Sequence, residues 1–235
     1  MIGIIGAMEE EVAALKEEMQ VQETKEIAGM TFVKGVLCGK EAVVVRSGIG
    51  KVNAALCAQI LASVFGVHAL INTGIAGSLD ARIDIGDIVI STDALYHDMD
   101  ATTFGDPAGQ VPRMDVFSFP ADPGLVELAR EANEEANPDI RTFVGRVVSG
   151  DQFISDADVK SRIKRLFDPL CTEMEGAGIA HAAYLNHISC VIIRAISDKA
   201  DNSATEDYPA FEKKAIVHNV RLVRALLPKI QEESL

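Results

Sequence analysis

Positive charge is scarce in this sequence. Its 235 residues contain 22 Lys and Arg against 35 Asp and Glu, so the formal net charge is −13 at pH 7, and no cluster of Lys or Arg interrupts this acidity. Proteins that bind nucleic acid or anionic membranes concentrate positive charge on one face. The composition therefore argues against both as partners.

Long apolar segments and paired cysteines are also missing. No stretch approaches the length of a membrane span. The N-terminal segment MIGIIGAMEEE has too short an apolar part for a signal peptide and carries acids where a cleavage site would lie. The four cysteines form no C-x-x-C pair, so we expect buried free thiols and a cytoplasmic location. They are Cys38, Cys57, Cys171 and Cys190.

The chain also lacks internal repeats, low-complexity segments and an interdomain linker. Hydrophobic residues make up 48% of it, enough for a sizeable core. Short apolar runs alternate with amphipathic segments, which predicts a single α/β domain over residues 1–235. We expect strands near 1–6, 31–37, 41–47, 68–73, 86–91, 141–149, 171–173 and 188–196, and helices near 9–19, 51–65, 123–137, 156–167, 176–186 and 209–230. Between them we expect a long loop at 102–119 and a polar loop at 201–205.

The segment from Cys171 to Asp198 is the most informative part of the sequence. It contains a strand that ends in Glu173-Met174-Glu175, a helix rich in Gly and Ala, and a second strand that ends in Ser197-Asp198. Ligands bind at the carboxyl ends of strands in open α/β sheets. Two acids and a methionine at one such edge indicate a site, although ordinary strand-end carboxylates facing water are the alternative.

Three consecutive acids follow the first predicted strand. Glu9, Glu10 and Glu11 fall in the first turn of a helix, where the helix dipole favours negative charge. That alone explains their presence. This turn also lies at the ligand edge of the predicted sheet, so one of the three can face inward.

Two motifs are weaker than they look. The segment SGIGK at 47–51 resembles a phosphate loop, but Val45 and Val52 stand where the Walker A motif requires Gly and Ser/Thr. The segment YHDMD at 96–100 offers one His and two Asp, a weak metal signal that a polar loop explains better. Neither motif supports nucleotide triphosphate or metal binding.

Eight motifs occur in order along nearly the whole chain: GIIGAMEEEV, SGIGKVNAA, NTG-x-AG, GDIV, YHD-x-D-x-T-x-FG, SGD-x-FI, EMEG-x-xIAH and VIIRAISD. Each is weak alone, but together they closely resemble the 5′-methylthioadenosine/S-adenosylhomocysteine nucleosidases of the purine nucleoside phosphorylase superfamily. The resemblance implies a three-layer α/β/α sandwich with a central mixed, partly barrel-like sheet. It also implies a homodimer that acts on an adenine nucleoside without a metal or cofactor.

The resemblance implies catalytic roles for three carboxylates. Asp198 resembles the general acid that protonates N7 of adenine, Glu11 the group that deprotonates the attacking water, and Glu175 the carboxylate that holds the ribose hydroxyls. N-glycosidic cleavage needs these same functions, because the leaving base must gain a proton while water attacks the opposite face. We therefore expect burial to raise the pKa of Asp198.

Further residues are implied by the resemblance as substrate contacts. Phe153 would stack on adenine beside the Ile154 backbone, and Met174 would lie against the sugar. Arg194 would lie near the attacking water. The remaining members of the expected set are Ala76, Gly77 and Ser197, and, around the 5′-substituent, Met8, Ile49, Phe104, Pro112 and Tyr208.

The chain departs from the family pattern most clearly at Ile75, where the family usually has Ser. This removes a hydroxyl expected near the attacking water. Ser78 in place of Gly and Tyr208 in place of Phe are milder departures.

Two other functions remain open. A phosphorylase would need a basic phosphate site, whereas Arg46 and Arg194 are the only arginines near the predicted strand exits, and Glu11 would repel phosphate. A non-catalytic nucleoside-binding protein would not need both an acid and a base. The sequence leaves the 5′-substituent open among methylthio, homocysteinyl, deoxyadenosine and deoxyfutalosine types.

Overall fold

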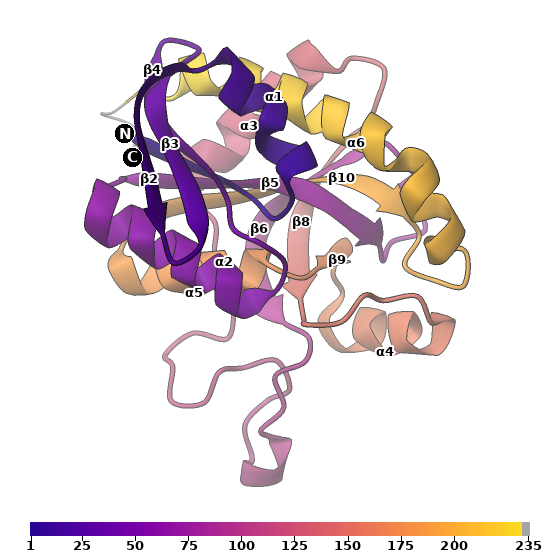
Figure 1. Ribbon diagram of the computed structural model, residues 1–235. Helices are drawn as coiled ribbons and strands as arrows, with labels where there is room; N and C mark the ends of the chain where they lie inside the picture. Colours follow the sequence, from indigo (N-terminus) through magenta and orange to yellow (C-terminus); the bar gives the residue numbers. More distant parts are fainter. Residues whose placement is uncertain (232–235) are drawn as a thin grey trace.

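The computed structural model describes residues 1–231 as one mixed sheet between two layers of helices (Figure 1). The helices are α1 (Glu9–Glu18), α2 (Lys51–Ile60), α3 (Pro123–Ala136), α4 (Ala157–Phe167), α5 (Gly176–Asn186) and α6 (Ala204–Leu226). The strands are β1 (Ile2–Gly6), β2 (Gln20–Ile27), β3 (Met30–Leu37), β4 (Lys40–Arg46), β5 (Ala69–Ser78), β6 (Ile88–Tyr96), β7 (Phe119–Pro120), β8 (Thr142–Ser149), β9 (Cys171–Glu173) and β10 (Ser189–Asp198).

Five of the strands close into a ring. β5 pairs with β10, β10 with β6, β6 with β8, β8 with β9, and β9 returns to β5. From β5 the sheet continues through β1, β4, β3 and β2. Parallel and antiparallel pairs both occur, so the expected sandwich with a mixed, partly barrel-like sheet is confirmed.

Each face of the sheet has its own apolar core. Residues of α1, α3 and α6 pack on one face, and residues of α2 and α5 pack on the other. A smaller cluster lies beneath α4. Strands covered on both faces need apolar residues at nearly every position. All ten residues of β5 are accordingly buried.

Close packing between α2 and α5 brings two chain segments of the site together. A Cβ atom on Gly178 would lie only 2.9 Å from the carbonyl oxygen of Lys51, so a larger residue there would push the helices apart. The same contact places Gly50, just before α2, within hydrogen-bond distance of Glu175, just before α5.

Several boundaries differ from the sequence prediction. β2 was not predicted because its residues are largely exposed and polar, without alternating apolar positions. α6 begins at Ala204 rather than at Pro209, so the expected loop at 201–205 is shorter. Of the four cysteines, Cys38 is exposed beside the β3–β4 turn, and the other three are buried as expected. Within residues 1–231, none of the helices has the length and apolar character needed to cross a membrane.

Candidate active site

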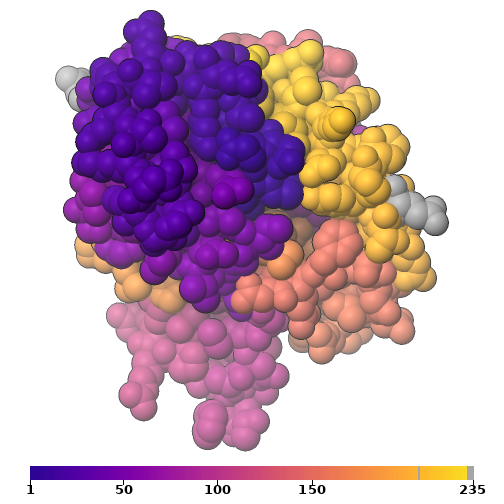
Figure 2. Space-filling view, in the orientation of Figure 1, coloured from indigo at the N-terminus to yellow at the C-terminus, as the bar shows by residue number. Residues whose placement is uncertain are grey.

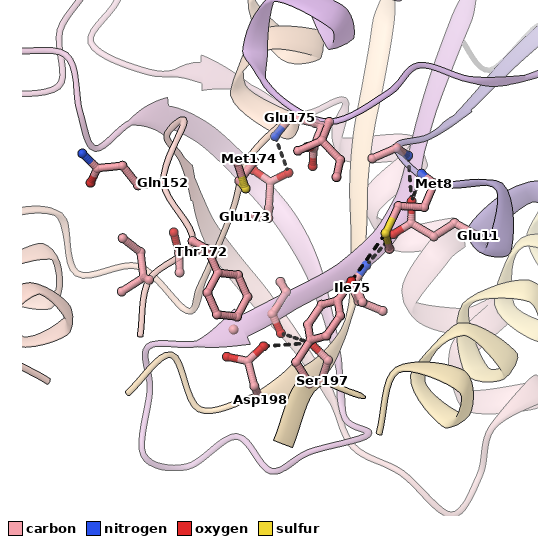
Figure 3. Close-up of a pocket in the computed structure, with 17 residues that line it drawn as sticks. Met8, Glu11, Ile75, Gln152, Thr172, Glu173, Met174, Glu175, Ser197 and Asp198 are labelled. Carbon is pink, nitrogen blue, oxygen red and sulfur yellow. Dashed lines mark hydrogen bonds between the residues drawn. The ribbon is translucent and has the colours of Figure 1, made fainter. Parts of the chain in front are cut away.

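A cavity of about 230 Å³ opens at the carboxyl ends of β5, β9 and β10 (Figure 3). No Lys or Arg is found among its lining residues in the described part of the chain. The lining consists of Ala7, Met8, Glu11, Ile49, Ile75, Ala76, Gly77, Gln152, Phe153, Ile154, Thr172, Glu173, Met174, Glu175, Ser197, Asp198 and Tyr208. Most of the expected contact residues therefore meet at one place.

Three expected contact residues lie elsewhere. Phe104 and Pro112 are exposed on the segment between β6 and β7, which extends away from the sheet as the lobe at the bottom of Figure 2. They do not contribute to the cavity of their own chain, because the segment runs outward after Tyr96. Arg194 is completely buried and lies behind the cavity wall.

Glu11 is the one acid of the first helical turn that faces inward. Glu9 and Glu10 are exposed, whereas Glu11 is buried. Its Oε2 accepts hydrogen bonds from the N–H groups of Ala7 at 2.7 Å and Met8 at 3.0 Å. Its Oε1 accepts one from the backbone of Ile75 at 3.2 Å. Burial raises the pKa of Glu11 despite the nearby Arg194 charge and these donors, which makes it a stronger base.

Asp198 is the last residue of β10 and is almost completely buried, with 2% of its surface exposed. Its Oδ1 accepts from the Ala200 N–H at 2.8 Å, and its Oδ2 accepts from Ser197 Oγ at 2.9 Å. Burial raises the pKa of Asp198 and outweighs these two donors. A Cβ atom on Gly77 would lie 2.7 Å from Asp198 Oδ1, so glycine leaves the room that this carboxyl needs.

Glu175 lies immediately before α5. Its Oε1 accepts from the N–H of Gly50 at 2.9 Å, and its Oε2 is 3.8 Å from Arg194 Nη2. Burial and the neighbouring Glu173 charge raise the pKa of Glu175. The glycine segment that resembles a phosphate loop therefore donates to a carboxylate of the protein itself.

The cavity mouth is apolar and partly open. Ile49 and Phe153 are half exposed there. The Tyr208 ring meets Phe153 edge to face, with 5.8 Å between ring centroids. The Tyr208 hydroxyl lies 3.4 Å from Met8 Sδ and 3.1 Å from Glu212 Oε1. The Tyr208 hydroxyl, which a Phe at this position would lack, therefore has hydrogen-bond partners at the cavity mouth.

Sequence reasoning missed part of the site. Ala7, Gln152, Thr172 and Glu173 line the cavity, and Asn72 contacts Arg194 behind it. A signal for Asn72 was present, because it is a polar residue inside a continuous apolar strand. Glu173 was visible as a strand-end acid, but spacing alone could not show what it contacts.

No group of three or more His, Cys, Asp or Glu side chains within residues 1–231 is arranged to hold a metal ion. What the cavity offers chemically is a set of buried carboxylates with unequal surroundings. Such sets divide acid and base roles between them.

The fold and this carboxylate-lined cavity define a member of the Phosphorylase superfamily, whose family model matches residues 1–228. A 5′-methylthioadenosine/S-adenosylhomocysteine nucleosidase of Halalkalibacterium halodurans is 43% identical over 230 residues, which cover 97% of this chain and 98% of that protein. Within the superfamily, the chain belongs to the 5′-methylthioadenosine/S-adenosylhomocysteine nucleosidase family.

Two solved structures of such nucleosidases superimpose closely on this chain. One, from Colwellia psychrerythraea in complex with adenine, is 38% identical with a TM-score of 0.93, and the match covers 97% of this chain and 94% of that one. The other, from Neisseria meningitidis in complex with methylthio-immucillin-A, is 35% identical with a TM-score of 0.93, and the match covers 97% and 99%.

The substitution Ile75→Ser tests the clearest departure from the family pattern. Ile75 is 8% exposed and packs in the core beneath α1 and α6. A new hydroxyl adds about 0.5–1.5 kcal/mol through one hydrogen bond, whereas loss of the buried side chain costs about 2–5 kcal/mol. We expect a lower melting temperature and a change in kcat of less than about tenfold. Thermal unfolding and steady-state kinetics on one preparation measure both, and a much larger rise in kcat would contradict this account.

Proposed function

We propose that this protein hydrolyses the N-glycosidic bond of 5′-methylthioadenosine and S-adenosylhomocysteine, releasing adenine and the 5′-thioribose product. The main support is a single cavity in which Glu11, Glu175 and Asp198 are brought together by α1, α5 and β10, with no Lys or Arg among the described residues that line it. The substrate class follows from the family to which the chain belongs.

Asp198 is suited to be the general acid. Its raised pKa keeps a proton on the carboxyl at a pH where an ordinary aspartate has lost it. We infer that this proton passes to N7 of adenine as the bond between C1′ and N9 breaks. A protonated carboxyl can donate to N7 and still accept from the 6-amino group, which favours adenine over 6-oxopurines.

Glu175 and Glu11 are suited to the ribose side of the reaction. As C1′ loses the base it becomes cation-like, and an ionised Glu175 stabilises this charge while it accepts hydrogen bonds from the ribose hydroxyls. Glu11 takes one proton from the attacking water, whose oxygen bonds to C1′. The hydroxyl of the water thus ends on C1′ and the proton from Asp198 ends on adenine, and Asp198 regains a proton while Glu11 loses one before the next turnover.

Since the described lining of the cavity contains no Lys or Arg, water is favoured over phosphate as the nucleophile. The Arg46 side chain is half exposed and lies 4.0 Å from Glu9. Arg194 is buried among carboxylates. We expect methylthioadenosine cleavage to proceed at the same rate with and without phosphate, measured as adenine release. Product formed only as ribose 1-phosphate would identify a phosphorylase, and bound but unchanged substrate would identify a binding protein.

The substitution Asp198→Asn tests the general acid. The amide has nearly the same shape and leaves no cavity, but it cannot donate the proton that leaves with adenine. We expect turnover to fall by about 10²–10⁴-fold while the melting temperature stays close to that of the parent. Glu11→Gln should lose activity similarly, through the water. A folded Asp198→Asn protein with near-normal turnover would remove Asp198 from the mechanism.

We also propose that the protein is a homodimer in which residues 97–118 of one copy cover the cavity mouth of the other. Phe104 is 88% exposed on this projecting segment, and an exposed aromatic ring gains stability when it is buried. The cavity mouth of each chain is apolar and partly open. This arrangement would let Phe104 and Pro112 line the 5′-substituent pocket of the partner.

Sedimentation equilibrium should therefore give twice the 25.2 kDa mass of one chain. We expect Phe104→Ser to raise KM for methylthioadenosine about tenfold, since burial of one aromatic side chain contributes about 1.5–3 kcal/mol. Val21→Ser is the matched control, because Val21 is 55% exposed on the edge strand β2. A monomer, or equal effects of the two substitutions, would contradict the dimer proposal.

A further inference from the structure

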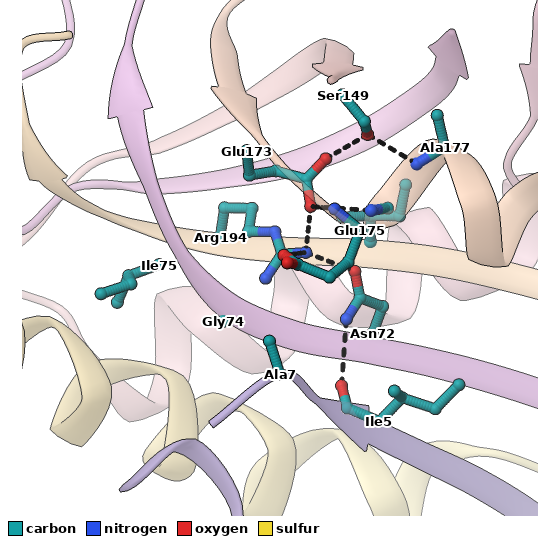
Figure 4. A network of polar contacts seen from close by, with 12 residues as sticks. Ile5, Ala7, Asn72, Gly74, Ile75, Ser149, Glu173, Glu175, Ala177 and Arg194 are labelled. Carbon is teal, nitrogen blue, oxygen red and sulfur yellow. Dashed lines mark hydrogen bonds and ion pairs between the residues drawn. The ribbon is translucent and has the colours of Figure 1, made fainter. Parts of the chain in front are cut away.

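A buried cation, Arg194, lies behind the cavity and pairs with two of the carboxylates that line it, Glu173 and Glu175 (Figure 4). Arg194 Nη2 donates to Glu173 Oε2 and, at 2.6 Å, to Asn72 Oδ1, and it lies 3.8 Å from Glu175 Oε2. Burial alone would lower the pKa of Arg194, but the charges of Glu173, Glu175 and Glu11 raise it. The guanidinium therefore stays charged, and its position decides which carboxylate it neutralises.

The backbone around Arg194 limits where the guanidinium can go. A side chain on Gly74 would collide with Arg194 Nη1 and would lie 2.8 Å from Glu11 Oε1. The Asn72 amide donates to the Ile5 carbonyl at 3.0 Å, which turns the Asn72 oxygen toward Arg194. The guanidinium thus packs directly against the backbone of β5 at Gly74, where there is no side chain.

Both carboxylate oxygens of Glu173 already accept hydrogen bonds from the protein. Besides Arg194, its Oε2 accepts from the N–H groups of Glu175 at 3.0 Å and Gly176 at 2.7 Å, the start of α5. Its Oε1 accepts from Ser149 Oγ. Glu173 touches the cavity but has little capacity left for a ligand. Glu175, by contrast, holds one backbone donor and only a distant guanidinium.

We infer that Glu173 is a positioning residue of the reaction: it draws Arg194 away from Glu175, which leaves the Glu175 charge available for the ribose hydroxyls and the cationic ribosyl centre. This inference rests on the proposed function. Without the Glu173 charge, Arg194 would turn to Glu175 and compete with the substrate for its oxygens.

The charged groups around Glu175 determine the direction of the pH effect. Glu173 faces it from β9, Arg194 from β10 and Glu11 from α1, and the Gly50 N–H faces it from the start of α2. Cys171 is a buried thiol that faces Arg194 from the same strand as Glu173. A neighbouring negative charge disfavours ionisation of a carboxyl, and a neighbouring positive charge favours it.

The test is the pH dependence of kcat/KM in the Glu173→Gln variant. Glutamine keeps the shape, since its oxygen can accept from the α5 N–H groups while its amide faces Ser149 Oγ. Removal of the negative charge should let Glu175 ionise at lower pH. We expect the acidic limb of the kcat/KM profile to move to lower pH by about one unit. We also expect kcat on the plateau to be about tenfold lower, because Arg194 then pairs with Glu175.

Two further variants separate positioning from a structural role. Arg194→Met removes the positive charge beside Glu175, so its acid limb should move to higher pH. Asp87→Asn is the matched control: Asp87 is a buried carboxylate that accepts from Arg141 Nη2 at 2.7 Å, away from the cavity, and its loss should leave the acid limb in place. If Glu173→Gln and Arg194→Met lose activity without moving the acidic limb in opposite directions, the inference is overturned.

The inference and the proposed function fail separately. If the parent protein does not cleave methylthioadenosine, the function is wrong. Ionisation of Glu175 can then be followed by NMR of the 13C-labelled glutamate carboxyl groups in the ligand-free protein. The same downward shift in Glu173→Gln would support the positioning role, and an unchanged titration would overturn it.

Discussion

The site depends on one buried ion-pair network. Arg194, inside β10, is the positive charge shared by Glu11, Glu173 and Glu175. Removal of charged groups from water costs several kcal/mol for each group, and only good geometry and further hydrogen bonds offset this. The network therefore requires β5, β9, β10 and the starts of α1 and α5 to keep fixed positions relative to one another. Any change that displaces Arg194 leaves carboxylates buried without a counter-charge.

The same acids are stabilised by the starts of helices. Glu11 accepts from the N–H groups that precede α1, Glu173 from those that begin α5, and Glu175 from the N–H that precedes α2. Helix N-termini favour negative charge and offer unpaired N–H donors. Negative charge is thus held at the cavity, and none of the residues within 1–231 that line it is a lysine or arginine. This suits a cation-like reaction centre and disfavours a phosphate nucleophile.

The strand-exit pattern made much of this site predictable. Glu11, Glu175 and Asp198 each follow a recognisable strand or turn, and carboxyl ends of neighbouring strands converge on one edge. The limits of prediction were also physical. β2 is an edge strand without an apolar pattern, and the start of α6 before Pro209 depends on tertiary packing that overrides local propensity. The long loop at 102–119 was predicted, but the sequence did not show that this segment extends away from the sheet and carries Phe104 with it.

The role of Glu173 could not be predicted, because the sequence gives spacing but not the direction of a side chain. In the structure, Glu173 turns inward to Arg194 and α5, whereas Glu175 turns toward Gly50. Glu173 and Glu175, two residues apart, therefore have different surroundings and different roles. Both roles depend on the position of Arg194.

The most direct measurement is the pH dependence of the unfolding free energy of Arg194→Met, compared with the parent between pH 5 and 8. Without the guanidinium, burial raises the pKa of Glu11 and of Glu175 still further above their unfolded values, so the folded protein holds extra protons. Stability is then present at low pH and is lost as pH rises, with a slope of about 1.4 kcal/mol per pH unit for each extra proton. The account predicts a steeper fall for Arg194→Met than for the parent. Parallel curves for the two proteins would contradict it.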